Sequence, residues 1–139
     1  MPRAPLPPEL DRFLRAPRAA IVGTVTPDGA PVTTPCWYDW ADGRFTISMA
    51  ADGPRVRNLR NDPRVALTVL ADDWYVHLSL LGRAVEFRDD ADLADIDALS
   101  QRYLGEPYED RSYAGTTVIA DVDRWHIWGN PGGYGATSA

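Results

Sequence analysis

The most concentrated positive charge in the chain lies in residues 55–64, RVRNLRNDPR. Four arginines and one aspartate give this segment a charge of +3, which leaves −9 on the rest of a chain of net charge −6. Pro54 predicts a helix start, so Arg55 and Arg57 fall in a first turn, where the helix dipole disfavours cations. Backbone N–H groups and guanidinium groups there would bind phosphate oxygens. The alternative is a solvated basic face paired with the acidic residues 89–97.

Small hydroxyl side chains lead toward these arginines. Thr46 and Ser48 share one face of a predicted strand, and Thr33 and Thr34 belong to its neighbour. A planar polar ring could lie along this surface with its phosphate at the helix. Serine and threonine are also common in strands, so the residue types alone leave both interpretations open.

Other catalytic chemistries lack their residues. His77, His126 and the single Cys36 show no metal-ligand spacing, so no metal site is predicted. The apolar strand around Cys36 favours a small buried residue over an activated thiolate. The pairs at 72–73 and 89–90 are predicted to be solvated turn carboxylates. All 14 basic residues are arginine, which excludes a Schiff-base or P-loop lysine.

The elements that must position these residues follow from hydrophobic periodicity. Strands alternate apolar and polar residues, whereas helices repeat them every three to four residues. Gly82, inside a long predicted strand, indicates a bulge. We predict helices at 6–16, 54–62 and 93–105, and six strands at 18–26, 31–40, 44–50, 65–69, 76–87 and 116–129. Six antiparallel strands with three helices favour a mainly β fold, a small β-barrel with helices at its edges.

Length and composition predict one globular domain over residues 1–139, with flexible tails at 1–5 and 130–139. No apolar run approaches the ~20 residues of a membrane helix, and the N-terminus lacks a signal-peptide core. We therefore expect a cytoplasmic protein without a membrane partner. The isoelectric point of about 4.7 argues against nucleic acid as a partner.

Several short motifs occur in a definite order. They are TPDGAP at 26–31, TTPCW at 33–37, TISMA at 46–50, PRVRNLRNDPRVAL at 54–67, GRAVEF at 82–87, RYLGEPY at 102–108 and RWHIWG at 124–129. This order resembles the pyridoxamine 5′-phosphate oxidase-like split-barrel family, over roughly residues 8 to 130. Within the family it is most similar to the flavin and deazaflavin oxidoreductases of the B type, many of which use coenzyme F420.

The resemblance implies a six-stranded antiparallel split β-barrel that binds its cofactor at the interface of a homodimer. It places the cofactor phosphate at Arg55, Arg57 and Asn58, with an arginine where many relatives have a lysine. Trp74 and Tyr75 would reach the ring from the second subunit. The ring itself would be contacted by Thr46, Ile47, Ser48 and Met49, with Thr34 and Pro35 nearby.

The activity implied is hydride transfer between F420 and a small planar or unsaturated organic substrate, with no side-chain catalyst because the cofactor carries the chemistry. Arg60 and Arg64 favour F420, whose phosphodiester and polyglutamate tail suit a broad basic groove. One alternative is an oxidase or reductase that uses flavin mononucleotide (FMN). Others are a flavin- or deazaflavin-binding protein without turnover, and a haem-binding relative with His77 or His126 as ligand.

Overall fold

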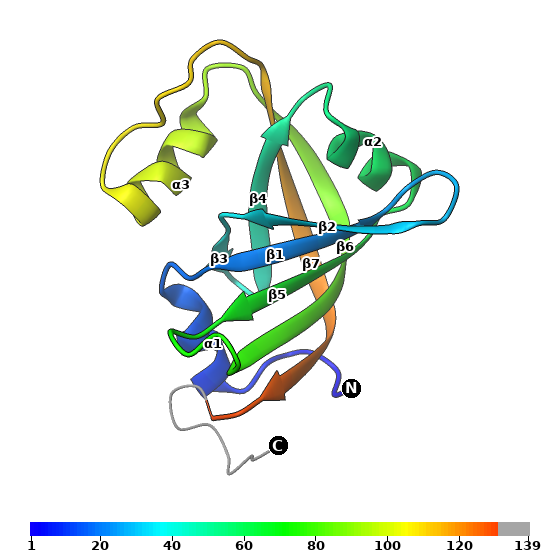
Figure 1. Ribbon diagram of the computed structural model, residues 1–139, viewed down its shortest axis with the longest axis vertical. Coiled ribbons are helices and arrows are strands. Elements are labelled where there is room, and N and C mark those ends of the chain that lie inside the picture. Colours follow the sequence, from blue (N-terminus) through cyan, green and yellow to red (C-terminus); the bar gives the residue numbers. More distant parts are fainter. Residues whose placement is uncertain (131–139) are drawn as a thin grey trace.

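Two long antiparallel strands, β6 (His77–Asp90) and β7 (Gly115–Trp128), form the centre of the sheet (Figure 1). The computed structural model describes residues 1–130. Its other elements are α1 (Pro8–Arg15), β1 (Ala20–Val25), β2 (Pro31–Cys36), β3 (Asp39–Ala41), β4 (Arg44–Ala50), α2 (Pro54–Asn61), β5 (Arg64–Leu70) and α3 (Ala94–Leu104). The described residues thus form a mainly β fold with three helices, as the sequence predicts.

All strand pairs are antiparallel, and the strand order is β2-β1-β5-β6-β7-β4-β3. The described chain therefore has seven strands, and the prediction of six is wrong. The sequence predicts one strand over 31–40, but the chain leaves the sheet at Trp37 and Tyr38. Tyr38 is fully buried, and its hydroxyl donates to the carbonyls of Leu14 and Ala16, each at 2.9 Å. This burial separates β2, which pairs with β1, from β3, which pairs with β4.

Gly82 lets the long strands bend, which confirms the predicted bulge. The register of β6 against β7 shifts between Leu81 and Gly82 and again between Ala84 and Glu86. A Cβ atom at Gly82 would lie 2.0 Å from the carbonyl oxygen of Asp121, so no other residue fits without displacing β7. Figure 1 shows the result, with β2, β1 and β5 running across the direction of β4 and β7.

The main core lies inside this bent sheet. β4 and β5 bury alternate side chains, as period-2 patterns predict. α1 adds Leu10, Phe13 and Leu14, and a large apolar side chain contributes roughly 1.5–3 kcal/mol when it becomes fully buried. A second, smaller cluster gathers Leu93, Ile96 and Leu99 of the α3 region under Trp37, Tyr108 and Tyr113.

The second acidic pair differs from its predicted role. β6 continues through residues 89–90, where the sequence predicts a turn. The Asp90 side chain is buried, and its carboxylate accepts hydrogen bonds from the backbone N–H groups of Asp95 (2.9 Å) and Ile96 (3.0 Å). It therefore caps α3, whereas a solvated turn carboxylate was expected. At the other end, Gly105 ends the helix with φ +77°, as predicted.

The N-terminal residues lie along β7. The Ala4 N–H donates to the Asp123 carbonyl at 2.9 Å, and the Trp125 N–H donates to the Pro2 carbonyl at 3.0 Å, where the sequence predicts a flexible tail. Of the predicted C-terminal tail, residues 131–139 lie outside the described part. Within residues 1–130, no helix is both long and apolar enough to cross a membrane.

Candidate functional site

A cavity of about 610 Å³ opens between α2 and α3, which lie at the same end of the sheet (Figure 1). Its walls come from α2, α3, β1, β2 and β4, from the segment between α1 and β1, and from the segments that follow β2 and α3. The lining residues are Pro17, Arg18, Ala19, Ala20, Pro35, Cys36, Trp37, Ser48, Arg55, Ile96, Leu99, Tyr103 and Tyr108. No carboxylate belongs to this lining, although the chain as a whole is acidic.

Two buried polar atoms in this cavity have no partner among the described residues. They are Nη1 of Arg55, in the first turn of α2, and Oγ of Ser48, on β4. Leaving a buried donor unsatisfied costs about 1–3 kcal/mol, more for a charged group. An anionic ligand in the cavity would offer hydrogen-bond acceptors to both. Because Arg55 also lies where the helix dipole favours an anion, the residues fit a phosphate group.

The alternative of a basic face paired with residues 89–97 does not hold in the described structure. Arg57 donates to the Asp52 carbonyl, Arg60 lies over the Phe87 ring and Arg64 pairs with Asp62. The acidic residue Asp95 pairs with Arg88 of β6 at 3.1 Å instead. None of the four arginines of 55–64 is therefore held by an acidic residue of 89–97.

Arg57 and Asn58 do not line the cavity, unlike Arg55. The exposed Arg57 donates from Nη1 to the Asp52 carbonyl at 2.6 Å. Asn58 is buried, and its Nδ2 donates to Oγ1 of the buried Thr24 at 3.1 Å. This bond fastens α2 to β1, so Asn58 positions the helix that carries Arg55.

The predicted ring-binding residues divide between the cavity and the core. Ser48 and Pro35 line the cavity, whereas Ile47 and Met49 point their side chains into the main core. Only the backbone of Ile47 and Met49 is left for a ligand. Thr46 of β4 and Thr34 of β2 are half-buried and lie outside the lining of this cavity.

Trp74 and Tyr75 lie in the turn between β5 and β6, away from the cavity of their own chain. Their exposed fractions are 69% and 59%, and their rings stack at 5.5 Å. The Tyr75 ring is also 6.5 Å from that of Trp128. Their role as contacts from a second subunit is untested in the single chain.

An aromatic wall faces the cavity from the α3 side, and the sequence did not assign it to the site. We define it as Trp37, Tyr103 and Tyr108. The Trp37 ring stacks on Tyr103 at 5.4 Å and meets Tyr108 edge-on at 5.9 Å. The motif RYLGEPY carries both tyrosines, Tyr103 on α3 and Tyr108 in the loop after it. This motif was the only sequence feature that grouped them.

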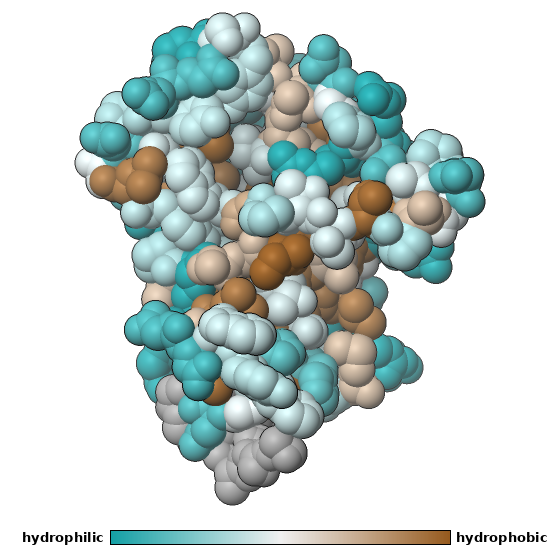
Figure 2. Space-filling model, in the orientation of Figure 1, coloured by the Kyte–Doolittle hydropathy of each residue, from teal (hydrophilic) through white to brown (hydrophobic). Residues whose placement is uncertain are grey.

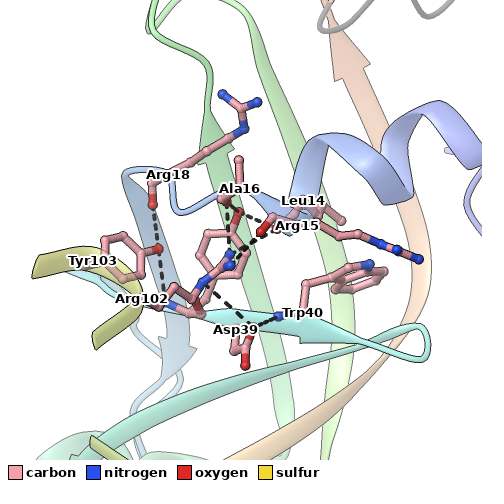
Figure 3. Close-up of polar contacts among 9 residues, drawn as sticks. Leu14, Arg15, Ala16, Arg18, Asp39, Trp40, Arg102 and Tyr103 are labelled. Atoms are coloured by element: carbon pink, nitrogen blue, oxygen red, sulfur yellow. Dashed lines mark hydrogen bonds and ion pairs between the residues drawn. The ribbon is translucent and has the colours of Figure 1, made fainter. Parts of the chain in front are cut away.

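α3 is held in place by Arg102 and Tyr103 (Figure 3). The Tyr103 hydroxyl donates to the Arg18 carbonyl at 2.7 Å. The Arg102 guanidinium donates to the carbonyls of Leu14, Arg15, Ala16 and Tyr38. These carbonyls include the C-terminal end of α1, where a cation is favoured by the helix dipole. The aromatic wall is thus fixed to α1 and to the segment before β1.

Cys36 also lines the cavity, but its thiol is not activated. Burial raises the pKa of Cys36 to about 11, although the Arg55 charge acts in the opposite direction. This raised pKa agrees with the inert thiol that the sequence predicts. Metal chemistry finds no support in the described residues either, where no three His, Cys, Asp or Glu side chains gather into a ligand set.

The sequence of residues 6–129 matches the family described as pyridoxamine 5′-phosphate oxidase. The chain belongs to this family. The resemblance drawn from the motifs is thereby confirmed, and the bent sheet above is the family's split barrel. Among curated proteins, no relative matches this member of the pyridoxamine 5′-phosphate oxidase family.

Solved structures share this fold. An F420 reductase is 24% identical, with a TM-score of 0.77 over 87% of this chain and 98% of its own. A conserved hypothetical protein from Mycobacterium tuberculosis is 25% identical, with a TM-score of 0.71 over 99% and 93%. HupZ of Group A Streptococcus is 19% identical, with a TM-score of 0.65 over 94% and 100%. At the identities of the first and third, the likeness shows the fold alone.

Proposed function

We propose that this protein is an oxidoreductase of the flavin and deazaflavin B type, which transfers a hydride between F420 and a small planar or unsaturated organic molecule. The observation that carries the proposal is the buried, unpartnered pair of Arg55 Nη1 and Ser48 Oγ in a cavity without carboxylates. Membership of the pyridoxamine 5′-phosphate oxidase family supports a cofactor with a phosphate.

The chain's own part is to bind, orient and exclude water. Arg55 and the first turn of α2 hold the phosphate, and the Ser48 hydroxyl donates to the same group or to the ring beside it. The aromatic wall shields the cavity from water on the α3 side. The bound F420 supplies the hydride chemistry, so no side chain is assigned as a catalyst.

The preference for F420 over FMN rests on the resemblance of the motifs to the flavin and deazaflavin oxidoreductases of the B type, and the F420 reductase shares the fold. The cavity lining does not include the arginines that were expected to form a broad basic groove for F420. Arg60 packs over the Phe87 ring at 4.4 Å, Arg64 pairs with Asp62 at 2.6 Å, and neither lines the cavity.

A second copy of the chain completes the site in this proposal. Trp74 and Tyr75 are exposed aromatic residues without a role in their own cavity, and they would contact the cofactor of the partner. Val32, Leu81 and Val85 are further exposed apolar residues on the strands. Figure 2 shows apolar residues exposed over the middle of the molecule, between more hydrophilic surroundings.

The test is to titrate cofactor-stripped protein separately with F420 and FMN, following tryptophan fluorescence. We then mix it with reduced F420 and a panel of enones and quinones, and follow the visible absorbance of oxidised F420. Tight F420 binding with acceptor-dependent oxidation supports the proposal. Tight FMN binding alone identifies the FMN branch, and F420 binding without turnover identifies a carrier. Binding of neither cofactor removes the case for a redox enzyme.

A further inference from the structure

A second arginine, Arg18, lines the same cavity and has no acidic partner among the described residues. It is half-buried, its guanidinium lies 4.0 Å from the centre of the Phe13 ring, and its Nε donates to the Phe13 carbonyl at 2.8 Å. In Figure 3 the guanidinium points away from the contacts of Arg102. Packing on Phe13 therefore fixes the side chain while both terminal nitrogens stay available.

Arg18 adjoins the aromatic wall. Its backbone carbonyl accepts the hydrogen bond from Tyr103, whose ring stacks on Trp37. Arg55 lines the cavity with Ser48 of β4 and with Cys36. The charge of Arg55 lowers the pKa of the Cys36 thiol, against the effect of burial. Arg18 and Arg55 are the two charged residues of the lining. The cavity thus has two arginines in its lining: Arg55, with Ser48, and Arg18, whose carbonyl holds Tyr103 and whose guanidinium packs on Phe13.

We propose that Arg18 and the aromatic wall form a subsite for a planar aromatic or conjugated molecule that carries a carboxylate. The rings of Trp37, Tyr103 and Tyr108 provide apolar surface for the flat part of the molecule. The two terminal nitrogens of Arg18 match the two oxygens of a carboxylate, because the guanidinium is planar and its Nε is already engaged.

This inference rests on the proposed function, in which Arg55 takes the cofactor phosphate, and it names the class of substrate as a carboxylate. The carboxylate that Arg18 binds could also belong to the cofactor, because the polyglutamate tail of F420 carries carboxylates. FMN has a phosphate but no carboxylate, so a comparison of the two cofactors separates these sources.

The test uses isothermal titration with two probes of matched shape, 2-naphthoate and its neutral amide 2-naphthamide. Wild-type protein is compared with Arg18→Gln and with Arg12→Gln, a control that removes the same charge from an exposed position on α1. We expect wild type and Arg12→Gln to bind 2-naphthoate about tenfold more tightly than the amide, as one charged hydrogen bond would give. Arg18→Gln should lose this difference and keep its affinity for the amide.

Equal affinity of wild type for the two probes, or an unchanged preference in Arg18→Gln, overturns the inference. If Arg18→Gln does not fold, Arg18→Lys and the wild-type probe comparison still decide it, because the lysine keeps the charge but not the paired geometry. It should therefore retain only part of the preference. Full retention in Arg18→Lys would overturn the paired geometry.

Cofactor titrations of the same variants separate the two sources. Unchanged affinity of Arg18→Gln for both F420 and FMN supports a substrate carboxylate. Weaker binding of F420 with unchanged FMN assigns Arg18 to the cofactor tail and overturns the substrate subsite. Failure of the wild type to bind either cofactor contradicts the proposed function, while the probe comparison still reports on Arg18.

Discussion

At the scale of single residues, the site depends on polar atoms that the protein itself leaves unsatisfied. Ser48 gives a direct test, because its buried hydroxyl has no partner in the described chain. Ser48→Ala should raise the free energy of unfolding of the ligand-free protein by up to about 1–3 kcal/mol, since no protein hydrogen bond is lost and an unsatisfied buried hydroxyl is removed. It should weaken cofactor binding by about 0.5–1.5 kcal/mol, the usual contribution of a neutral hydrogen bond.

Chemical denaturation and fluorescence titration of Ser48→Ala measure these two quantities. Ser79→Ala is the control, because Ser79 lies on β6 outside the cavity, with its hydroxyl 3.5 Å from that of Thr68. A Ser48→Ala variant that binds cofactor as the wild type does would remove Ser48 from the site.

Cys36 gives a pH-dependent test of the cavity wall. Burial raises the pKa of its thiol to about 11, so the reactive thiolate is scarce near neutral pH. Alkylation of the folded protein by iodoacetamide should therefore be much slower at pH 8 than that of the same cysteine in urea. The rate should keep rising as the pH approaches 11. A rate that levels off between pH 8 and 9 would mean that the thiol is not buried as described.

The sequence could reveal only part of this site. Arg55 stood out because a cation in the first turn of α2 conflicts with the helix dipole, and that conflict is local. Arg57 shares the pattern but lies on the exposed side of the helix, and Asn58 is occupied by Thr24. The aromatic wall joins Trp37 to residues of α3, and no local pattern shows a contact between parts so far apart in sequence.

At the scale of elements, α3 forms one side of the cavity, and Asp90 holds its first turn. Asp90→Ala removes the acceptor of two backbone N–H groups, one buried and one part-buried, and leaves both without this partner. We expect a loss of about 1–3 kcal/mol in the free energy of unfolding, with faster hydrogen exchange confined to α3. Asp89→Ala, at the exposed neighbouring position, should change neither. Uniform exchange changes across the sheet would contradict a local cap.

Most elements could be predicted from periodicity, because alternation in β4 and β5 and the apolar face of α3 are local patterns. The break between β2 and β3 could not. Residues 31–40 read as one extended run, and only the tertiary burial of Tyr38 against α1 turns the chain away from the sheet. The end of β6 at Asp90 was also missed. A pair of aspartates is typical of a turn, and only the contact of Asp90 with α3 shows its actual place.

At the scale of the whole molecule, the proposal requires two chains. Sedimentation should give a mass near twice 15.4 kDa, because the site is incomplete without Trp74 and Tyr75 of a partner. Trp74→Ala should leave the sedimented mass unchanged if the interface is broad, but weaken cofactor binding. A monomer that binds cofactor with full affinity would contradict a site shared between subunits.

The central claim is that Arg55 binds the cofactor phosphate, and calorimetric titration of F420 into wild type, Arg55→Ala and Arg12→Ala tests it most directly. We expect Arg55→Ala to lose about 1.5–3 kcal/mol of binding free energy for each charged hydrogen bond, which is roughly a 10- to 150-fold rise in Kd for one bond. Arg12→Ala removes the same charge from an exposed position on α1, and this variant should bind F420 as the wild type does. Equal affinity of Arg55→Ala and wild type would contradict the account.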